Sequence, residues 1–145
     1  MRLNIKRSIL VLGLAVMVIA VAVIRVRSVS AQEGVVRTVI LKQELEADTG
    51  KEVTMLVADY KPGAKTGKHY HPGQEFIYVL EGHGVMEEMG KAPVDMKPGV
   101  AIYFKSDPKK PAYVHEGTNL SKTEGMKLLV ILITEKGQPL AYPVM

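Results

Sequence analysis

The chain has 145 residues, a formal net charge of +4 and no cysteine, and this length fits a single domain. Five basic and no acidic residues lie in the first 31, so residues 32–145 hold 14 basic and 15 acidic residues and lack the basic excess expected of a nucleic-acid-binding domain. The absence of cysteine excludes disulfides and thiolate-bound zinc, which leaves nitrogen and oxygen donors for any metal.

The first 31 residues predict an export signal. Three basic residues precede an apolar run at residues 9–24, and small residues follow it up to Ala31. A charged region, an apolar region and a small-residue cleavage site are typical of a secretory signal. The apolar run has sixteen residues and two arginines follow it, so an uncleaved membrane anchor is the alternative. Both interpretations place the remaining domain outside the cytoplasm, and we expect a periplasmic location.

Residues 32–145 predict one all-β domain. Apolar or alternating runs separated by glycine and proline turns indicate strands at residues 35–41, 52–60, 66–71, 75–81, 85–88, 92–96, 100–104, 112–115 and 126–134. The last of these is almost continuously apolar and predicts a central core strand. Residues 42–51 predict a loop with one helical turn at 44–48, and residues 118–125 a polar loop. This pattern indicates a sandwich or a barrel without choosing between them.

The stretch at residues 63–82 carries the most informative chemistry. His69 and His71 are two residues apart, so on a strand both imidazoles leave the same face while Tyr70 points away. A Pro-Gly turn follows, and Glu75 can return a carboxylate towards the two imidazoles. Two imidazoles and one carboxylate from adjacent strands predict a metal site of the kind used by non-haem iron. The alternative is a group of solvated loop residues beside several lysines.

This stretch resembles the first motif of the cupin family, G(X)5HXH(X)3,4E(X)6G, whose fixed positions are filled here by Gly63, His69, His71, Glu75 and Gly82. The second motif, G(X)5PXG(X)2H(X)3N, is matched only in part. Its end is present as His115 and Asn119, but the sequence S-D-P-K-K-P-A-Y-V replaces the expected P-x-G. The resemblance covers residues 37–143 and is strongest to small single-domain (type-2) cupins. It implies a double-stranded β-helix, or jelly-roll, fold.

The resemblance also implies one divalent transition metal, which is iron, manganese, nickel, zinc or copper in this family, bound by His69, His71, Glu75 and His115. Without the resemblance, His115 alone would be an ordinary loop histidine. A histidine with a pKa of about 6.5 keeps its lone pair mostly free near pH 7. Four protein ligands leave about two open positions on a six-coordinate ion for water, oxygen or a chelating substrate.

Other notable side chains have simpler interpretations. His83 lies between two glycines and is expected to be a solvent-facing turn residue rather than a substrate contact. Tyr103, Phe104 and Tyr113 flank the altered loop and are expected to fill the barrel, with lining of the site mouth as the alternative. The lysines at residues 105–110 predict a solvated loop rather than a surface that attracts an acidic substrate.

Two classes of function remain open. A metal-dependent oxygenase-type enzyme acting on a small organic molecule would use the open metal positions. A non-catalytic periplasmic module that binds a metal or a small ligand is the alternative, because no acid or base outside the ligand set is identifiable and the second motif is incomplete. No catalytic residue is assigned, and a membrane is a partner only if the first segment is uncleaved. The resemblance, with apolar strands near both ends of the domain, also implies a homodimer formed through the outer sheet.

Overall fold

The structure is a computed structural model that describes residues 34–46, 49–105 and 113–144. The described residues form strands and no helix, so no helix among them is long and apolar enough to cross a membrane. The strands, in chain order, are β1 (Val35–Glu44), β2 (Lys51–Tyr60), β3 (His69–Tyr70), β4 (Gln74–Glu81), β5 (Gly84–Glu88), β6 (Val94–Met96), β7 (Ala101–Phe104), β8 (His115–Asn119), β9 (Met126–Glu135) and β10 (Tyr142–Pro143).

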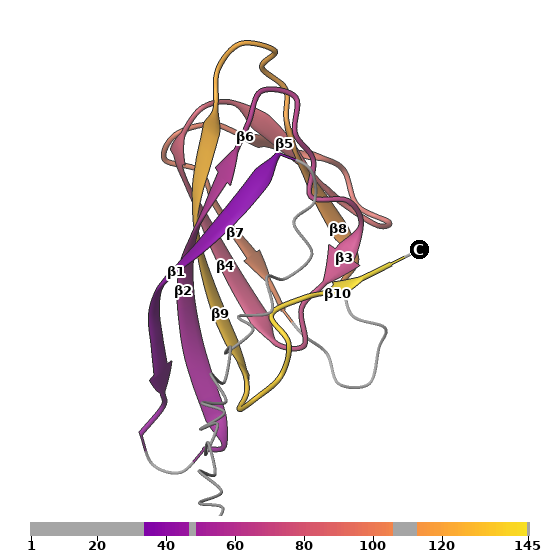
Figure 1. Cartoon of the computed structure of the whole chain (residues 1–145). Coiled ribbons are helices and arrows are strands. Elements are labelled where there is room, and N and C mark those ends of the chain that lie inside the picture. Colours follow the sequence, from indigo (N-terminus) through magenta and orange to yellow (C-terminus); the bar gives the residue numbers. More distant parts are fainter. Residues whose placement is uncertain (1–33, 47–48, 106–112, 145) are drawn as a thin grey trace, which may run out of the picture.

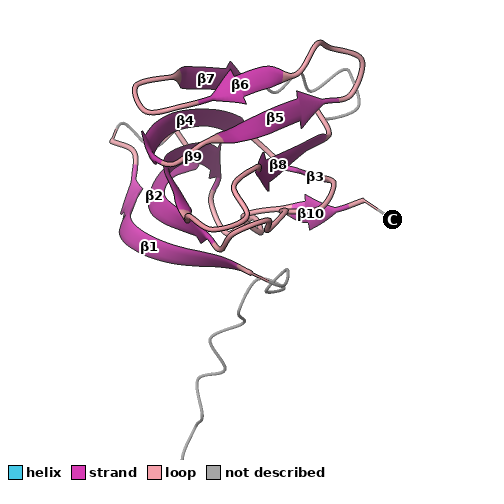
Figure 2. Ribbon diagram, turned by 90° about the horizontal axis from the view of Figure 1, so that it is seen from above, coloured by secondary structure: helices cyan, strands magenta, loops and turns pink. Residues whose placement is uncertain are grey.

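These strands make two antiparallel sheets that face one another (Figures 1 and 2). The first sheet has the order β1-β2-β9-β4-β7, and the second has the order β10-β3-β8-β5-β6. Several neighbours in each sheet are far apart in sequence, as in the pairing of β2 with β9 and of β3 with β8. Two facing sheets with such crossovers form the expected jelly-roll, and its interior is the space between the sheets.

The interior is built by the strict alternation of side chains along β2 and β9. Every second residue of both strands is buried, and the intervening residues are half-buried or exposed on the outer face. In β2 the inward residues include Leu56, Ala58 and Tyr60, while Val53, Met55 and Val57 lie on the outer face. The long apolar run of β9 is therefore central to its sheet, as predicted, and is apolar on both faces.

The end of β4 and the end of β8 are held by residues of the two sequence motifs. Gly82 has a φ of 83°, and a Cβ at this position would lie 2.5 Å from the carbonyl oxygen of Gly125. Asn119 is buried, and its side-chain amide donates hydrogen bonds to the carbonyl oxygens of Lys61 (3.0 Å) and Glu124 (2.8 Å). Both motif residues therefore act on the backbone and do not reach the histidines.

Several predicted boundaries are wrong or incomplete. The expected strand at residues 112–115 is wrong, because β8 begins at His115 and continues to Asn119, inside the predicted polar loop. The strand predicted at residues 66–71 is reduced to His69–Tyr70, which pairs with β8 and β10, while Lys65 forms only an isolated bridge with Thr118 of β8. No helical turn forms at residue 44, which is still in β1, and residues 47–48 lie outside the described residues. The predicted export segment, residues 1–31, also lies outside them.

Candidate metal site

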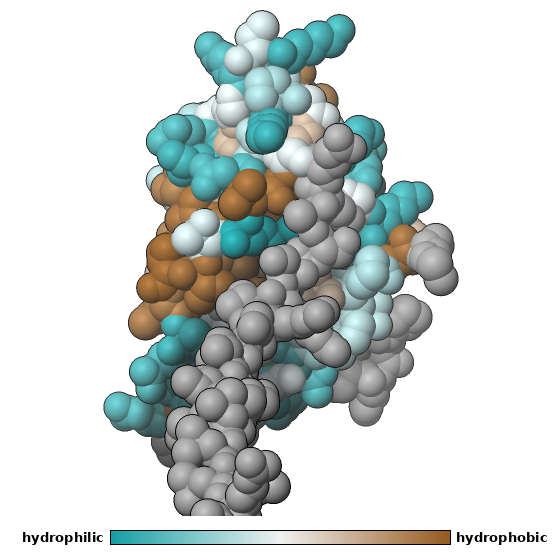
Figure 3. Space-filling view, viewed as in Figure 1, coloured by the Kyte–Doolittle hydropathy of each residue, from teal (hydrophilic) through white to brown (hydrophobic). Residues whose placement is uncertain are grey.

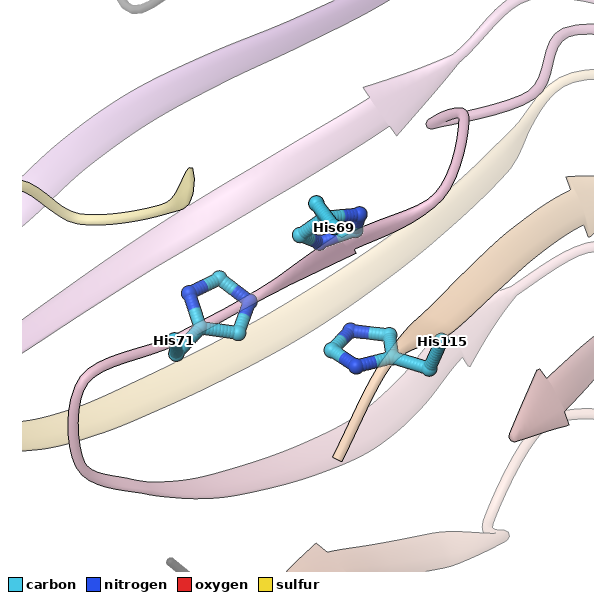
Figure 4. A group of neighbouring side chains, drawn as sticks. All are labelled: His69, His71 and His115. Atoms are coloured by element: carbon cyan, nitrogen blue, oxygen red, sulfur yellow. The ribbon is translucent and has the colours of Figure 1, made fainter. Parts of the chain in front are cut away.

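Three buried histidines meet between the two sheets (Figure 4). His69 is in β3, His71 follows that strand directly, and His115 begins β8 as the register partner of His69. One nitrogen from each ring lies within 4.8 Å of the others, so the three side chains could hold a metal ion. The predicted geometry of the pair is confirmed. His69 and His71 both point inward, while Tyr70 points away and stacks on Tyr142.

Backbone carbonyl groups select the tautomer of two of these rings. Nδ1 of His69 donates a hydrogen bond to the carbonyl oxygen of Gly67 at 2.9 Å, and Nδ1 of His71 donates to the carbonyl oxygen of Leu140. A ring that carries its proton on Nδ1 keeps the Nε2 lone pair free. Such hydrogen bonds to the far nitrogen are the usual support of a metal-binding histidine. The two hydrogen bonds thus leave Nε2 as the metal-binding nitrogen of both rings.

Glu75, at the start of β4, completes the cluster from the opposite sheet. Its Oε1 lies 3.3 Å from Nε2 of His71, and its Oε2 lies 3.4 Å from Nε2 of His115. Nε2 of His71 and Oε2 of Glu75 are buried without a hydrogen-bond partner among the described residues. Unpartnered buried polar atoms are costly, and a divalent ion between them would satisfy both. The four side chains named from the sequence therefore converge, and their donor types fit a transition metal.

The turn between the two ligand-bearing segments depends on Gly73. A Cβ on this residue would collide with the carbonyl group of Ile133 in β9, so the turn packs directly against the neighbouring strand. The carbonyl oxygen of Gly73 also accepts a hydrogen bond from the hydroxyl of Tyr113 at 3.0 Å. These contacts fix the path from His71 to Glu75, and hence the distance between their side chains.

The electrostatics of the cluster keep two of its rings neutral. Burial lowers the pKa of His69 to about 3, helped by the nearby His115. Burial likewise lowers the pKa of His115, although Glu75 opposes the effect. Burial also acts to lower the pKa of His71, but the carboxylate of Glu75 outweighs it and the pKa is raised. The same interaction holds the pKa of Glu75 below its usual value despite complete burial. The site therefore carries an ionised carboxylate and free lone pairs on His69 and His115 near neutral pH, whereas Glu75 favours the protonated form of His71 in the metal-free protein.

Aromatic side chains hold His115 from behind. The ring of Phe104 stacks on His115 with a centroid distance of 4.7 Å, and Tyr113 stacks on both rings. The prediction that these aromatics fill the barrel is confirmed for Phe104 and Tyr113. It is wrong for Tyr103, because the alternation of β7 places that residue on the outer face, where it stacks on Phe76.

A small cavity adjoins the cluster, with a volume of about 30 Å³. Its walls are mostly apolar side chains from the inner faces of β2, β4 and β9, and its polar lining includes Arg37, Tyr60 and Thr66 besides the histidines and Glu75. The sequence reasoning did not identify Arg37 as a site residue. No local signal marked it, because apolar residues occupy both faces of residues 35–41, and only the pairing of Arg37 with the buried Ala58 shows that it faces inward.

The other charged candidates do not reach the site. His83 is exposed, as predicted, and its Nε2 lies 2.6 Å from a carboxylate oxygen of the exposed Asp95. Lys105 is exposed at the end of β7, and the lysines at residues 109–110 lie outside the described residues.

Comparison with known proteins agrees with this geometry. The family model described as the cupin domain matches residues 56–132, while a search of curated proteins finds no match. Solved structures with the same fold include a double-stranded β-helix protein from Klebsiella pneumoniae (20% identity, TM-score 0.58), which covers 76% of this chain and 86% of its own. A cupin-like protein from Thermotoga maritima has 24% identity and a TM-score of 0.55, covering 76% of this chain and 75% of its own.

A recombinant oxalate oxidase in complex with glycolate is also similar, with 18% identity and a TM-score of 0.57, and it covers 79% of this chain and 57% of its own. At these identities the structural likeness establishes the fold alone. The family match spans more than half of the sequence and includes all four clustered side chains, His115 among them. The chain belongs to the cupin family.

Proposed function

We propose that the domain binds one divalent transition metal through His69, His71, Glu75 and His115 and acts as an oxygenase-type enzyme on a small organic molecule. The observation that carries the metal site is the buried convergence of these four side chains, which leaves atoms of His71, Glu75 and His115 without a hydrogen-bond partner among the described residues. The ion, when bound, would supply a Lewis acid with open coordination positions. The chain itself supplies an apolar cavity that limits water beside those positions.

Metal analysis of the purified protein tests the site. We expect about one equivalent of metal in the wild-type protein and a loss of most of it in a His69→Ala, His71→Ala double variant. His83→Ala is the matched control, because it removes an exposed histidine two residues beyond β4. Equal metal content in the wild-type protein and the double variant would refute the proposed ligand set.

A non-catalytic binding module is the second candidate, and one observation favours it. The only carboxylate that lines the cavity among the described residues is Glu75, which the metal would use. The remaining candidates for a general acid or base would then be Tyr60 and a metal-bound water. Burial raises the pKa of Tyr60 well above its usual value, which favours the neutral phenol as a proton donor at most.

Oxygen uptake separates the enzyme from the module. The protein is loaded anaerobically with iron, manganese, nickel or copper and offered small organic acids, diketones and phenols. Uptake that requires both metal and substrate, and that falls in a Glu75→Gln variant, is the result expected of the enzyme. Ligand binding without turnover for every metal would favour the module.

We also propose that the domain is exported to the periplasm by residues 1–31, with cleavage after Ala31. The support is the order of charged, apolar and small residues in this segment. N-terminal sequencing of the mature protein should begin near Gln32. An intact Met1 in the membrane fraction would favour the anchored alternative.

A homodimer is the proposed assembly, formed through the outer face of the first sheet. Two apolar rows cross this face from strand to strand: Leu41, Met55, Ile131, Phe76 and Tyr103, then Val57, Leu129, Tyr78 and Ala101. A shallow groove of about 230 Å³ lies over β4, β7 and β9. Figure 3 shows an apolar area, in brown, on the side where β1 and β2 lie.

An ion-paired rim borders the two apolar rows. Lys127 lies 3.9 Å from Asp59 and 3.4 Å from Glu81, so polar groups surround an apolar centre as they do in many interfaces. A second copy is the natural occupant, since a two-fold axis pairs one such face with itself. Light scattering at micromolar concentration should give a dimer mass that becomes monomeric in a Phe76→Glu variant, and a monomeric wild-type protein would refute the assembly.

A further inference from the structure

One cation of the site cavity has no role in the proposed metal cluster. Arg37 lies on β1 opposite Ala58 of β2, and Ala58 is buried on the inner face of the sheet. Because paired residues of an antiparallel sheet share a face, the side chain of Arg37 enters the interior. It is half-buried there and lines the same cavity as the histidines and Glu75. A guanidinium thus faces a space whose other walls are mostly apolar.

The guanidinium has no carboxylate partner within 4.0 Å among the described residues. The contrast on the same strand is Lys42, whose ammonium lies 2.9 Å from the buried carboxylate of Glu52. A half-buried arginine has five N–H donors in a fixed plane, and a carboxylate is the group that matches them in pairs. The surroundings of Arg37 therefore lack the anion that its chemistry is suited to bind.

The charge balance of the site points the same way. Three neutral imidazoles and the Glu75 carboxylate around a divalent ion leave one net positive charge, and Arg37 adds a second. An apolar cavity holds such an excess only when an anion enters with the ligand.

The size of the cavity restricts the anion. A volume of about 30 Å³ is room for roughly two water-sized groups. A ligand that reaches the cluster past Arg37 is therefore short, with its carboxylate and its reactive atoms only a few bonds apart. Aromatic acids and flavonols exceed this space in the described structure.

We propose that Arg37 binds the carboxylate of a two- or three-carbon organic acid and holds it in front of the His69, His71, His115 and Glu75 cluster. This deepens the proposed function, on which it rests, by naming small carboxylates as the substrate class. Arg37 acts as a specificity-determining residue. It selects the acid over the corresponding neutral amide, and it orients the rest of the molecule towards the open side of the cluster.

Calorimetric titration of the full chain tests the proposal. Acetate, pyruvate and oxalate are titrated into metal-free and manganese-loaded protein, with acetamide, pyruvamide and oxamide as neutral controls. At least one acid should bind the wild-type protein at least about tenfold more tightly than its amide, as charge-assisted pairing predicts. Arg37→Gln should remove that preference in the metal-free protein and reduce it in the manganese-loaded protein, where the ion also binds the carboxylate, and Arg37→Lys should keep part of it.

Three controls make the outcome decisive. Lys97→Gln removes an exposed cation outside the cavity and should bind as the wild-type protein does. Metal content and the thermal unfolding midpoint are measured for every variant, and Arg37→Met replaces Arg37→Gln if the latter does not fold. Equal acid binding in the wild-type protein and the Arg37 variants would overturn the proposal, and so would the absence of binding by every acid to the wild-type protein. If the wild-type protein instead holds no metal, the proposed metal site fails, while the titrations of metal-free protein still judge Arg37.

Discussion

Two groups of histidine and carboxylate in this chain have opposite surroundings. In the cluster, the side chains of His71 and Glu75 are 6% and 3% exposed, and their nearest nitrogen and oxygen are 3.3 Å apart. In the pair formed by His83 and Asp95, the side chains are 56% and 57% exposed and the atoms are 2.6 Å apart. The shorter contact belongs to the group with the weaker claim to function.

Distance explains part of this difference. Two ligand atoms on one transition metal, each about 2.1 Å from it, are roughly 3.0–3.5 Å apart, which matches the separations of 3.3 and 3.4 Å around Glu75. The separation of 2.6 Å in the exposed pair is that of a direct hydrogen bond with no room for an ion. The exposed pair consists of two solvated side chains, while the buried group consists of four side chains that are shielded from solvent. Several buried polar side chains that meet with unsatisfied atoms therefore identify a functional site better than one short contact does.

The largest expected difference between the two groups is in metal affinity. Glu75→Gln removes the negative charge of the cluster and replaces one carboxylate oxygen by an amide nitrogen, so we expect the affinity for a divalent metal to fall by at least about 100-fold. Asp95→Asn is the matched change in the exposed pair and should leave the affinity unaltered. Competition with a chelating dye at pH 7 measures both. Similar affinities for Glu75→Gln and the wild-type protein would remove Glu75 from the ligand set.

The backbone next to the exposed pair is more constrained than its side chains are. His83 is solvated, but the neighbouring Gly82 packs closely against another segment of the chain. Gly82, next to His83, has a φ of 83°, and a Cβ would lie 2.5 Å from the oxygen of Gly125. Gly82→Ala should therefore lower the free energy of unfolding by about 3 kcal/mol or more, from steric overlap and backbone strain together.

Gly90 provides the matched control for this change. Its φ is 80°, but a Cβ would meet nothing within 4 Å, so Gly90→Ala carries the strain alone and should cost about 1–2 kcal/mol. Urea unfolding of the two variants measures the difference. Equal losses of stability would show that the chain around Gly82 shifts to accept a Cβ with no further loss of free energy of unfolding.

The sequence predicted the metal cluster well because its signals are local. Two histidines on one face, a turn and a carboxylate lie within seven residues, and the strand alternation that buries them is equally local. The family resemblance was needed only for His115, which lies 40 residues beyond Glu75 in the sequence.

Features that depend on pairing between distant segments could not be predicted from the sequence. The carbonyl of Leu140 that orients His71 is 69 residues away, and only the sheet order brings the two together. The inward side of β1 and of β7 depends on register with β2 and β4, so neither Arg37 in the cavity nor Tyr103 on the outer face was identified. The predicted position of β8 was wrong for the same reason. Its polar sequence gives no strand signal, and the strand forms because it pairs with β5.

In the metal-free protein, the buried cluster and the exposed pair should also differ in how they change the stability as the pH falls. The pKa of His69 is about 3 when folded and about 6.5 when unfolded, so the unfolded chain binds the proton first. Its contribution to stability is complete above pH 6.5 and is lost as the pH falls towards 3, a change on the order of a few kcal/mol. Urea midpoints measured between pH 7 and 4 should fall more steeply for the wild-type protein than for His69→Gln, and parallel curves would contradict the buried, neutral state of this ring.

The smallest effect is expected from breaking the exposed pair itself. Its hydrogen bond from His83 holds the pKa of Asp95 below the usual value, so the pair adds stability above that range and loses it only as the pH falls through the lowered pKa. Both side chains are solvated, and water replaces the contact when it breaks, which leaves little net gain. His83→Gln should therefore shift neither the urea midpoint at pH 7 nor the metal content beyond experimental error. A clear loss of metal in this variant would mean that the exposed pair communicates with the cluster through β5 and β8, the strands that join them in one sheet.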